Sequence, residues 1–180
     1  MIVTVSGEIG AGKSTVAREL ARALGLRYLS SGEIFREEAR RRGITLAALG
    51  RQAEEDPSID RAIDQAQVTE ARAGDIVIES RLSGWLVDGD VRVWLRAPAE
   101  VRARRVAARD GMPIDAARAD VDNREDCERR RYAALYRIDL GDLSRYHLIL
   151  DTSLWGPEDI THAIAGLARA LRGERSGRRL

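Results

Sequence analysis

Short apolar runs alternate with longer segments of helical periodicity along the 180 residues of the chain. The apolar runs are bounded by polar or turn-forming residues, a pattern that predicts short buried strands. We expect these strands at residues 2–5, 28–29, 75–79, 91–95 and 146–151. Between them, apolar residues recur at a helical spacing. Helices are expected at residues 13–24, 33–42, 45–73 with a break at Pro57, 98–109, 113–136 and from 157 onward.

The regular alternation of strands and helices defines the fold class. Strands that alternate with helices form a parallel sheet with helices on both faces. The strands are short and apolar, as strands buried on both sides are. A length of 180 residues fits one domain. We therefore expect a single α/β domain in three layers with a five-stranded parallel sheet.

The segment between the first strand and the first helix carries the clearest chemical signal. Its sequence is Gly7-Glu8-Ile9-Gly10-Ala11-Gly12-Lys13-Ser14, which fits the phosphate-binding pattern G-x-x-x-x-G-K-[ST]. Such a loop turns backbone N–H groups toward phosphate oxygens at a helix N-terminus. Lys13 can reach the β- and γ-phosphates, and the Ser14 hydroxyl can bind Mg²⁺. The alternative is an ordinary glycine-rich turn, which would not need the lysine and serine.

Composition excludes several other classes of protein and leaves a single lysine for the chemistry. The chain has 30 basic and 29 acidic residues, and Lys13 is its only lysine, so the other 29 basic residues are arginine. The net charge of +1 argues against a nucleic-acid binder that relies on a broad basic field. The single cysteine excludes an internal disulfide framework. Because no apolar run approaches the ~20 residues that span a bilayer, we expect no membrane partner and a cytoplasmic protein.

The arginines indicate which class of phosphate-binding protein this is. A GTPase-type switch is excluded, because it needs a guanine-reading N-K-x-D motif and the lone lysine is already in the loop. Large motor ATPases are excluded because they need a longer chain. A small phosphoryl-transfer kinase remains, and its acceptor phosphate needs arginine clamps. Arg36 lies one turn into the second helix, and Arg81 follows the third strand at the ligand-binding edge of the sheet. Glu79 ends that strand, where a carboxylate can orient Mg²⁺.

Other polar residues fit two interpretations. Asp60, Asp64 and Gln65 could contact an acceptor base or form the wet face of a helix. The arginines of residues 102–137 favour a solvated helix with ion pairs along it. The three tryptophans are expected to pack in the interior rather than to stack on a ligand. The basic tail at residues 173–180 is expected to be a solvated, frayed end, with a phosphate-binding arm as the alternative.

Five motifs along nearly the whole chain resemble those of nucleoside monophosphate kinases. Residues 6–15 are similar to the phosphate-binding loop of that group, and residues 31–36 to the S-x-G-x-[IL]-[FY]-R segment of cytidylate and adenylate kinases. Residues 79–85 (Glu-Ser-Arg-Leu-Ser-Gly-Trp) resemble the E-G-R-L-A-G-W of archaeal-type cytidylate kinases. Residues 131–139 resemble their R-Y-x-x-x-Y-G-I-D, and residues 151–157 resemble their N-T-S-x-W-x-P ending.

Together the loop motif and the resemblance assign roles to particular residues. The residues expected to be catalytic are Lys13, Arg81, Arg124 and Arg131. The residues expected to bind ATP are Gly7, Gly10, Ala11, Gly12, Lys13, Ser14 and Thr15. The residues expected to bind the acceptor are Ser31, Gly32, Arg36, Arg81 and Glu128. The expected Mg²⁺ ligands are Ser14 and Glu79.

Three residues depart from the family pattern. Glu8 takes an apolar or proline position in the loop, and an acid is tolerable beside phosphates if it faces solvent. Ser80 replaces a glycine, which could crowd the acceptor. Arg137 replaces the glycine before Ile138. None of these changes removes a phosphate ligand.

These features predict an ATP- and Mg²⁺-dependent kinase that acts, as a monomer, on a pyrimidine monophosphate: CMP first, and dCMP also. Its expected parts are a core at residues 1–30, 74–110 and 142–172, an acceptor-binding helical insertion at 31–73, a helical lid at 111–141 and the tail. One alternative is another small-acceptor kinase, acting on AMP, dephospho-coenzyme A or a metabolite. The others are a non-catalytic ATP-binding module and an arginine-driven RNA binder.

Overall fold

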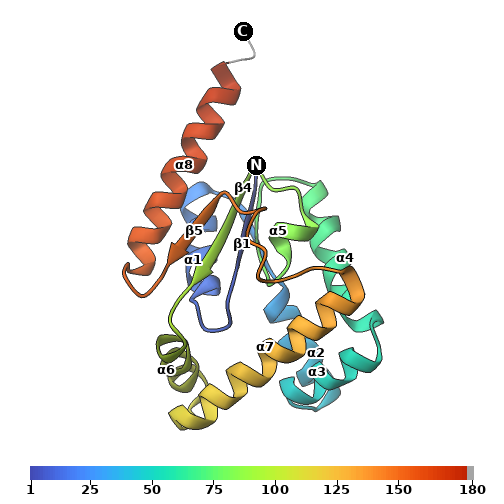
Figure 1. The fold of residues 1–180 in the computed structure, drawn as a ribbon. Coiled ribbons are helices and arrows are strands. Elements are labelled where there is room, and N and C mark those ends of the chain that lie inside the picture. The colour runs from blue at the N-terminus through green and yellow to red at the C-terminus, as the bar shows by residue number, and fades with distance from the viewer. Residues whose placement is uncertain (178–180) are drawn as a thin grey trace.

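The computed structural model describes the backbone of residues 1–177 and the side chains of residues 1–173. Five strands form one sheet in the order β2-β3-β1-β4-β5, and every neighbouring pair is parallel. The strands are β1 (Ile2–Gly7), β2 (Arg27–Ser30), β3 (Ile76–Glu79), β4 (Val91–Arg96) and β5 (Leu148–Asp151). The predicted α/β fold with a five-stranded parallel sheet is therefore confirmed (Figure 1).

Helices follow the strands closely in the predicted order. They are α1 (Lys13–Leu24), α2 (Ser31–Arg42), α3 (Leu46–Glu55), α4 (Ser58–Arg72), α5 (Ser83–Leu86), α6 (Ala99–Asp110), α7 (Ile114–Tyr136) and α8 (Pro157–Gly177). The break at Pro57 separates α3 from α4, as predicted. Helix α5 was not predicted, because a single turn is too short to show a helical period.

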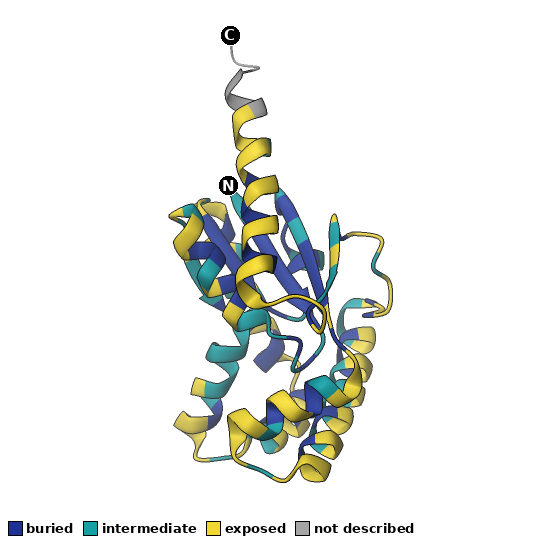
Figure 2. Ribbon diagram, turned by 90° about the vertical axis from the view of Figure 1, so that its left-hand side faces the viewer, coloured by how far each residue is buried: buried dark blue, intermediate teal, exposed yellow. Residues whose placement is uncertain are grey.

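The two faces of the sheet are covered by different helices because side chains alternate along each strand. Val3, Val5 and Val77 point to one face, where they pack against α1 and α8. Ile76 and Ile78 point to the other face, where they pack with Ala71 of α4 and with Val87 after α5. Figure 2 shows the buried residues concentrated in the strands between these two layers. Packing on both faces holds the sheet in place, so the residues at its carboxyl edge have fixed positions.

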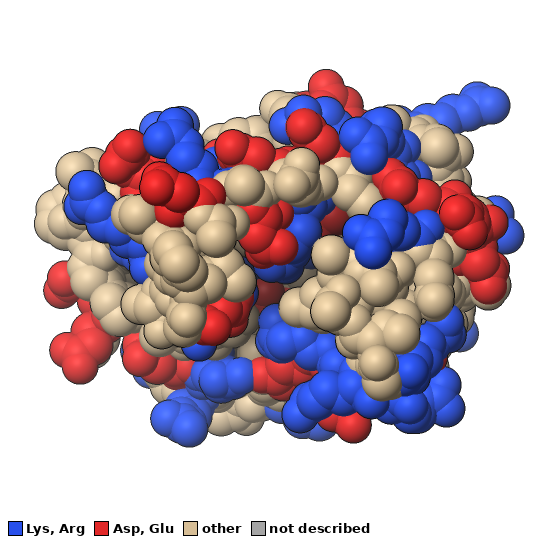
Figure 3. Space-filling model, turned by 90° about the horizontal axis from the view of Figure 1, so that it is seen from below, with Lys and Arg blue, Asp and Glu red and all other residues tan. Residues whose placement is uncertain are grey.

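Helices α2, α3, α6 and α7 extend beyond the carboxyl edge of the sheet (Figure 1). Helix α7 is the longest of the described helices, at 23 residues, and it packs against α6 and α3. Seen from this end, basic and acidic side chains are interspersed over the surface (Figure 3). Basic side chains gather most densely over the lower right of this view, and acidic side chains are more frequent over the upper part (Figure 3).

Arg137 ends α7 in the left-handed region, with φ 57° and ψ 31°. A non-glycine residue costs about 1 kcal/mol there, because its Cβ crowds the following carbonyl oxygen. This conformation explains why the resembling pattern has a glycine at this position. Arg137 still forms the left-handed C-cap that a glycine would form, and its backbone N–H donates to the carbonyls of Ala133 and Tyr132.

Helix α8 continues through Gly177, so part of the segment predicted as a frayed tail is helical; residues 178–180 lie outside the described residues. The outer turns of α8 extend past the amino edge of the sheet, away from the phosphate-binding loop (Figure 1). Within the part of the chain that the structure describes, no helix is long and apolar enough to cross a membrane.

Candidate active site

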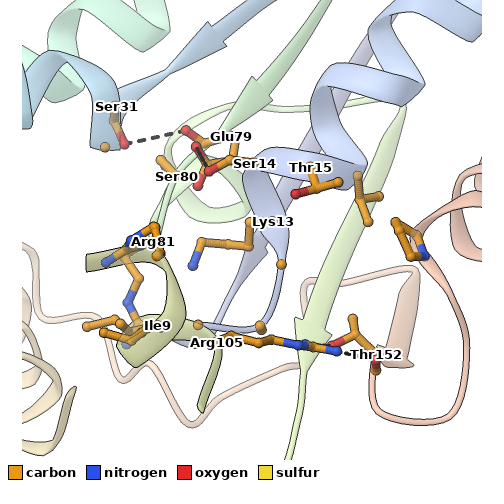
Figure 4. A pocket seen from close by; sticks show the side chains of 18 of the residues that line it. Ile9, Lys13, Ser14, Thr15, Ser31, Glu79, Ser80, Arg81, Arg105 and Thr152 are labelled. Carbon is orange, nitrogen blue, oxygen red and sulfur yellow. Dashed lines mark hydrogen bonds between the residues drawn. The ribbon is translucent and has the colours of Figure 1, made fainter. Parts of the chain in front are cut away.

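A cavity of about 430 Å³ opens at the carboxyl edge of the sheet. Its walls come from the phosphate-binding loop and the start of α1, the start of α2, the end of β3 and the turn after it, helices α6 and α7, and the turn before α8 with the start of that helix. Figure 4 shows side chains from these elements around Lys13. The predicted site residues that line it are Gly10, Ala11, Gly12, Lys13, Ser14, Thr15, Ser31, Gly32, Arg36, Glu79, Arg81, Arg124 and Glu128.

A second cavity of about 400 Å³ lies between α2, α3, α4 and α7. Arg131 lines this cavity and not the first. The two cavities have one wall in common, formed by Ser31, Gly32, Arg36, Arg81, Arg124 and Glu128. The structure thus brings together the residues predicted to bind the acceptor and places them between two spaces.

The phosphate-binding loop has the backbone that its glycines permit. Gly10 and Gly12 lie in the left-handed region, with φ of 81° and 84°. A Cβ on Gly10 would come within 2.8 Å of the Arg102 carbonyl oxygen, so this position admits only glycine. Gly7 lies just outside the cavity, and its carbonyl accepts a 2.6 Å hydrogen bond from Arg81. The loop is therefore shaped by contacts behind it as well as by its own sequence.

Lys13 is the only ammonium group among the side chains of the site. Its Nζ donates to the Glu8 carbonyl at 2.8 Å. Burial lowers the pKa of Lys13 to about 8, with the Arg81 charge adding to the shift and the Glu79 charge opposing it. A phosphate placed here would favour the charged form. Lys13 is thus poised to gain from an anionic ligand.

Glu79 is 4% exposed at the end of β3, beside the loop. Its Oε2 accepts hydrogen bonds from Ser14, at 3.3 Å, and from Ser30. Ser30 also caps α2 by accepting from the Glu33 N–H, and sequence reasoning missed it in favour of Ser31. Within the described residues, no cluster of three or more His, Cys, Asp or Glu forms a metal cage. One hydroxyl with a nearby carboxylate suits Mg²⁺, which keeps phosphate and water oxygens as its other ligands.

Arg81 joins three parts of the site. Its Nε donates to Glu128 of α7 at 2.6 Å, its NH1 reaches the Gly7 carbonyl, and its guanidinium lies over the Trp94 ring. Because both Arg81 and Glu128 are largely buried, this ion pair is screened little by solvent. The pair fixes the Arg81 guanidinium at the wall that the two cavities share.

Two further arginines complete the shared wall. Arg36 lies over the first turn of α2, close to Gly32. Among the described side chains, no carboxylate lies within 4.0 Å of Arg36, so its guanidinium is available to a ligand. Arg124 makes one 3.3 Å contact with Asp120 on its own helix. A fork-shaped guanidinium without a carboxylate partner, as Arg36 has among the described side chains, is suited to bidentate phosphate binding.

The second cavity has a polar floor that sequence reasoning left open. Asp60 is buried and pairs with Arg131 at 2.6 Å. Asp64 accepts a 2.7 Å hydrogen bond from Tyr136, and burial raises the pKa of Asp64 to about 6. Both aspartates line the cavity, whereas Gln65 is exposed and bonds Thr69. The wet-face interpretation therefore holds for Gln65 only.

One prediction about a residue at the first cavity is wrong. Trp155 does not pack in the interior; it is 60% exposed and lines the cavity, because the turn before α8 lifts it away from the sheet. Arg105 is exposed on α6, as predicted for its stretch, and it also lines the cavity and donates 2.7 Å bonds to the hydroxyl and carbonyl oxygens of Thr152 (Figure 4). Trp94 packs on Tyr146, as predicted.

Glu8 also departs from expectation. Its carboxylate does not point to solvent: Oε2 accepts a 3.0 Å bond from the Ala97 N–H and lies 3.4 Å from the Arg102 guanidinium. Arg102 is itself buried, whereas we predicted that the arginines of residues 102–137 lie on a solvated helix with ion pairs along it. The acid is therefore tolerated because a buried cation holds it behind the loop. Ser80 turns its hydroxyl to the Leu82 N–H, so it serves the start of α5.

A phosphate-binding loop at the edge of a parallel sheet, with arginines facing it, defines a small P-loop kinase. The fold is also that of solved kinases. Shikimate kinase from Acinetobacter baumannii, in complex with shikimate, superposes with a TM-score of 0.60 at 20% identity, covering 94% of this chain and 93% of that one. A gluconokinase from Sinorhizobium meliloti superposes with a TM-score of 0.60 at 19% identity, covering 97% and 95%.

Sequence comparison identifies the family within this class. The profile of the cytidylate kinase-like family matches residues 2–154, and the chain belongs to that family. It is 43% identical over 172 residues to the cytidylate kinase of Methanothrix thermoacetophila, covering 96% of this chain and all of the relative. It is 44% identical over 178 residues to that of Halobacterium salinarum, covering 97% and 93%.

Proposed function

We propose that this protein transfers the γ-phosphoryl group of ATP to CMP, giving CDP and ADP. The observation that carries the proposal is the wall of six residues shared by two cavities. A phosphoryl transfer needs the acceptor phosphate next to the γ-phosphate of the donor and in line with it, and the six residues that line both cavities mark where the two phosphates can meet. The names of the curated relatives support CMP as the acceptor.

The donor belongs in the first cavity. The backbone of the phosphate-binding loop faces this space, and Lys13 and Thr15 line it. Arg105 and Trp155 lie at its far end, where a planar base can stack on an exposed indole. Mg²⁺, when bound near Ser14 and Glu79, supplies charge neutralisation of the β- and γ-phosphates.

The acceptor belongs in the second cavity, with its phosphate at the shared wall. Arg36 and Arg81 are placed to hold two of its oxygens, and Arg124 from α7 faces the phosphoryl group in transfer. Asp60 and Asp64 lie deeper, where carboxylate oxygens can accept from the exocyclic amine of cytosine. The acidic floor therefore favours CMP over UMP, which presents a carbonyl oxygen at that position.

The chemistry asks little of the protein beyond positioning and charge. An anionic oxygen of the CMP phosphate forms a bond to the γ-phosphorus while the bond from that phosphorus to the β,γ-bridging oxygen breaks. No general base is required, because the attacking oxygen is already ionised at neutral pH. Lys13 stabilises charge on the bridging side, and Arg81 and Arg124 stabilise charge on the transferring group.

Helix α7 and its flanking segments are proposed to act as a lid. They carry Arg124, Glu128 and Arg131 to the site, and closure over ATP would keep water from the γ-phosphate. The residues of both cavities come from one chain, so we propose a monomer. We place the reaction in the cytoplasm, where ATP and free nucleoside monophosphates are available.

A panel of acceptors tests the proposal. Release of ADP from ATP is measured with CMP, dCMP, UMP, AMP and dephospho-coenzyme A under identical conditions. We expect the highest kcat/KM with CMP, with dCMP next. Turnover with AMP alone would indicate an adenylate kinase instead. ATP binding without phosphotransfer to any acceptor would indicate a non-catalytic module and would contradict the proposal.

A further inference from the structure

Ile9, the third residue of the phosphate-binding loop, is held on every side by α6 and α7. Its N–H donates to Glu125 Oε1 of α7 at 3.1 Å, and its carbonyl accepts from Arg102 of α6 at 3.1 Å. Its side chain is 4% exposed and packs with Val106 of α6 and Val121 of α7. The loop is therefore anchored at its tip to two helices that lie outside the phosphate cradle.

Arg102 and Glu125 form a buried pair at the centre of this anchor. Arg102 NH1 lies 2.8 Å from Glu125 Oε1, and the two side chains are 8% and 15% exposed. Arg102 also contacts the Glu8 carboxylate, at 3.4 Å, and donates to the Ala97 carbonyl. A single carboxylate of α7 thus satisfies both a loop N–H and the cation that holds Glu8 in place.

The same helix grips the loop a second time. Glu128 lies one turn after Glu125 on α7 and holds Arg81, which donates to the Gly7 carbonyl. Both ends of the segment from Gly7 to Ile9 are therefore connected to the position of α7. If α7 moves away, the Ile9 N–H and the Arg102 charge lose their shared partner together.

We infer that Glu125 is a positioning residue that couples the packing of α7 against α6 and the loop to the conformation of the phosphate-binding loop. When α7 packs against the loop, it fixes the Ile9 segment through the contacts described above, and a bound donor that stabilises this loop conformation in turn stabilises the packing of α7. Such coupling is reciprocal, and its usual size is a five- to 150-fold change in affinity, as an order of magnitude. The inference rests on the proposed use of ATP, and it concerns no contact between Glu125 and substrate.

The chain supplies a matched control on the same two helices. Arg118 of α7 pairs with Glu100 of α6 at 3.3 Å, but the two side chains are 57% and 60% exposed and neither contacts the loop. Glu125→Ala and Arg118→Ala each remove one ion pair between α6 and α7. Only the first removes a partner of the phosphate-binding loop, so the two variants separate the loop contact from helix packing.

The experiment measures ATP affinity without acceptor, and then KM for ATP and for CMP. We expect Glu125→Ala to weaken ATP binding about tenfold and to raise KM for ATP while KM for CMP changes less than twofold. ATP should slow amide hydrogen exchange across α7 in the parent protein and do so less in this variant. Arg118→Ala should behave as the parent does. Equal ATP affinity in Glu125→Ala and the parent, or equal rises in both KM values, would overturn the inference.

Glu125→Gln keeps the inference testable if Glu125→Ala does not fold. The amide oxygen can still accept from Ile9, but the neutral group no longer balances Arg102, so we expect a smaller loss of ATP affinity. ATP affinity equal to that of the parent in this variant overturns the inference as well. Because ATP binding is measured alone, absence of CMP turnover in the parent would contradict the proposed function and leave this result interpretable.

Discussion

The donor and acceptor sides of the site are built in different ways. On the proposed donor side, one continuous segment, residues 9–16, lines the cavity. The proposed acceptor side is assembled from residues of α2, α3, α4, α7 and the turn after β3, which lie far apart in the sequence. The donor side therefore depends on the shape of one loop, and the acceptor side depends on how several helices pack.

This difference predicts where substitutions act. A change inside the loop should affect the chemical step whatever the acceptor, because every reaction uses the same donor phosphates. A change on the acceptor side should alter one substrate and spare the other. The following predictions test that separation, beginning with the largest effect.

Lys13→Arg is expected to lower kcat by about 100-fold or more with the fold intact, the size of loss typical for removing one electrostatic contact to the transition state. Lys13 is half-buried and its ammonium is held against the Glu8 carbonyl of the loop, where a planar guanidinium cannot take the place of a compact ammonium. The measurement is ADP release with saturating CMP, together with thermal unfolding. Arg104→Lys, at an exposed position on α6, is the control and should leave both unchanged. Near-normal activity in Lys13→Arg would mean that the placement of the single lysine is coincidence.

The same contrast explains what the sequence could predict. The strands, most helices and the phosphate-binding loop depend on local patterns, and each was predicted within a few residues. Arg36 and Arg81, which we propose hold the acceptor phosphate, could be singled out because they sit at fixed places after strands of a parallel sheet. Local sequence patterns therefore predict a large part of the fold and the proposed donor half of the site.

Residues whose role depends on tertiary packing could not be predicted in this way. Arg102 and Arg104 lie two positions apart on one helix, yet the first is buried against the phosphate-binding loop and the second is 68% exposed. Nothing in the local sequence separates them, because only the approach of α7 decides which arginine is covered. Trp155 differs from Trp94 for the same reason: a turn, and not composition, decides whether the ring is buried.

Arg36→Ala is expected to raise KM for CMP by roughly 10- to 100-fold, since a charge-assisted hydrogen bond contributes about 1.5–3 kcal/mol. KM for ATP should stay within about twofold, because the donor phosphates are held by the loop. Steady-state kinetics with each substrate varied in turn give both values. Arg40→Ala serves as the control on the same helix, since Arg40 is exposed and pairs only with Glu37 among the described residues. A rise in both KM values for Arg36→Ala would show that the two sides are not separate.

Asp64→Asn is expected to have the smallest effect and to act in opposite directions on stability and on binding. The pKa of Asp64 is raised from 3.8 to about 6, chiefly by burial, so the folded state binds this proton more tightly than the unfolded state. Stability must then fall as pH rises from about 4 to about 6, and the cost remains above that range. Asparagine does not titrate, and its amide can still bond Tyr136 and Gln67, whose Oε1 has no hydrogen-bond partner among the described residues.

Urea unfolding at several pH values checks this expectation. At pH 7, Asp64→Asn should raise the free energy of unfolding by about 2 kcal/mol, and most of that gain should be lost near pH 4. If Asp64 accepts from the cytosine amine, the same variant should bind CMP less well and narrow the preference for CMP over UMP. A gain in stability without any change in that preference would place the base elsewhere in the second cavity. Asp64 would then be a buried acid that the fold tolerates for its bond to Tyr136, and the acceptor side would depend on fewer residues than its lining suggests.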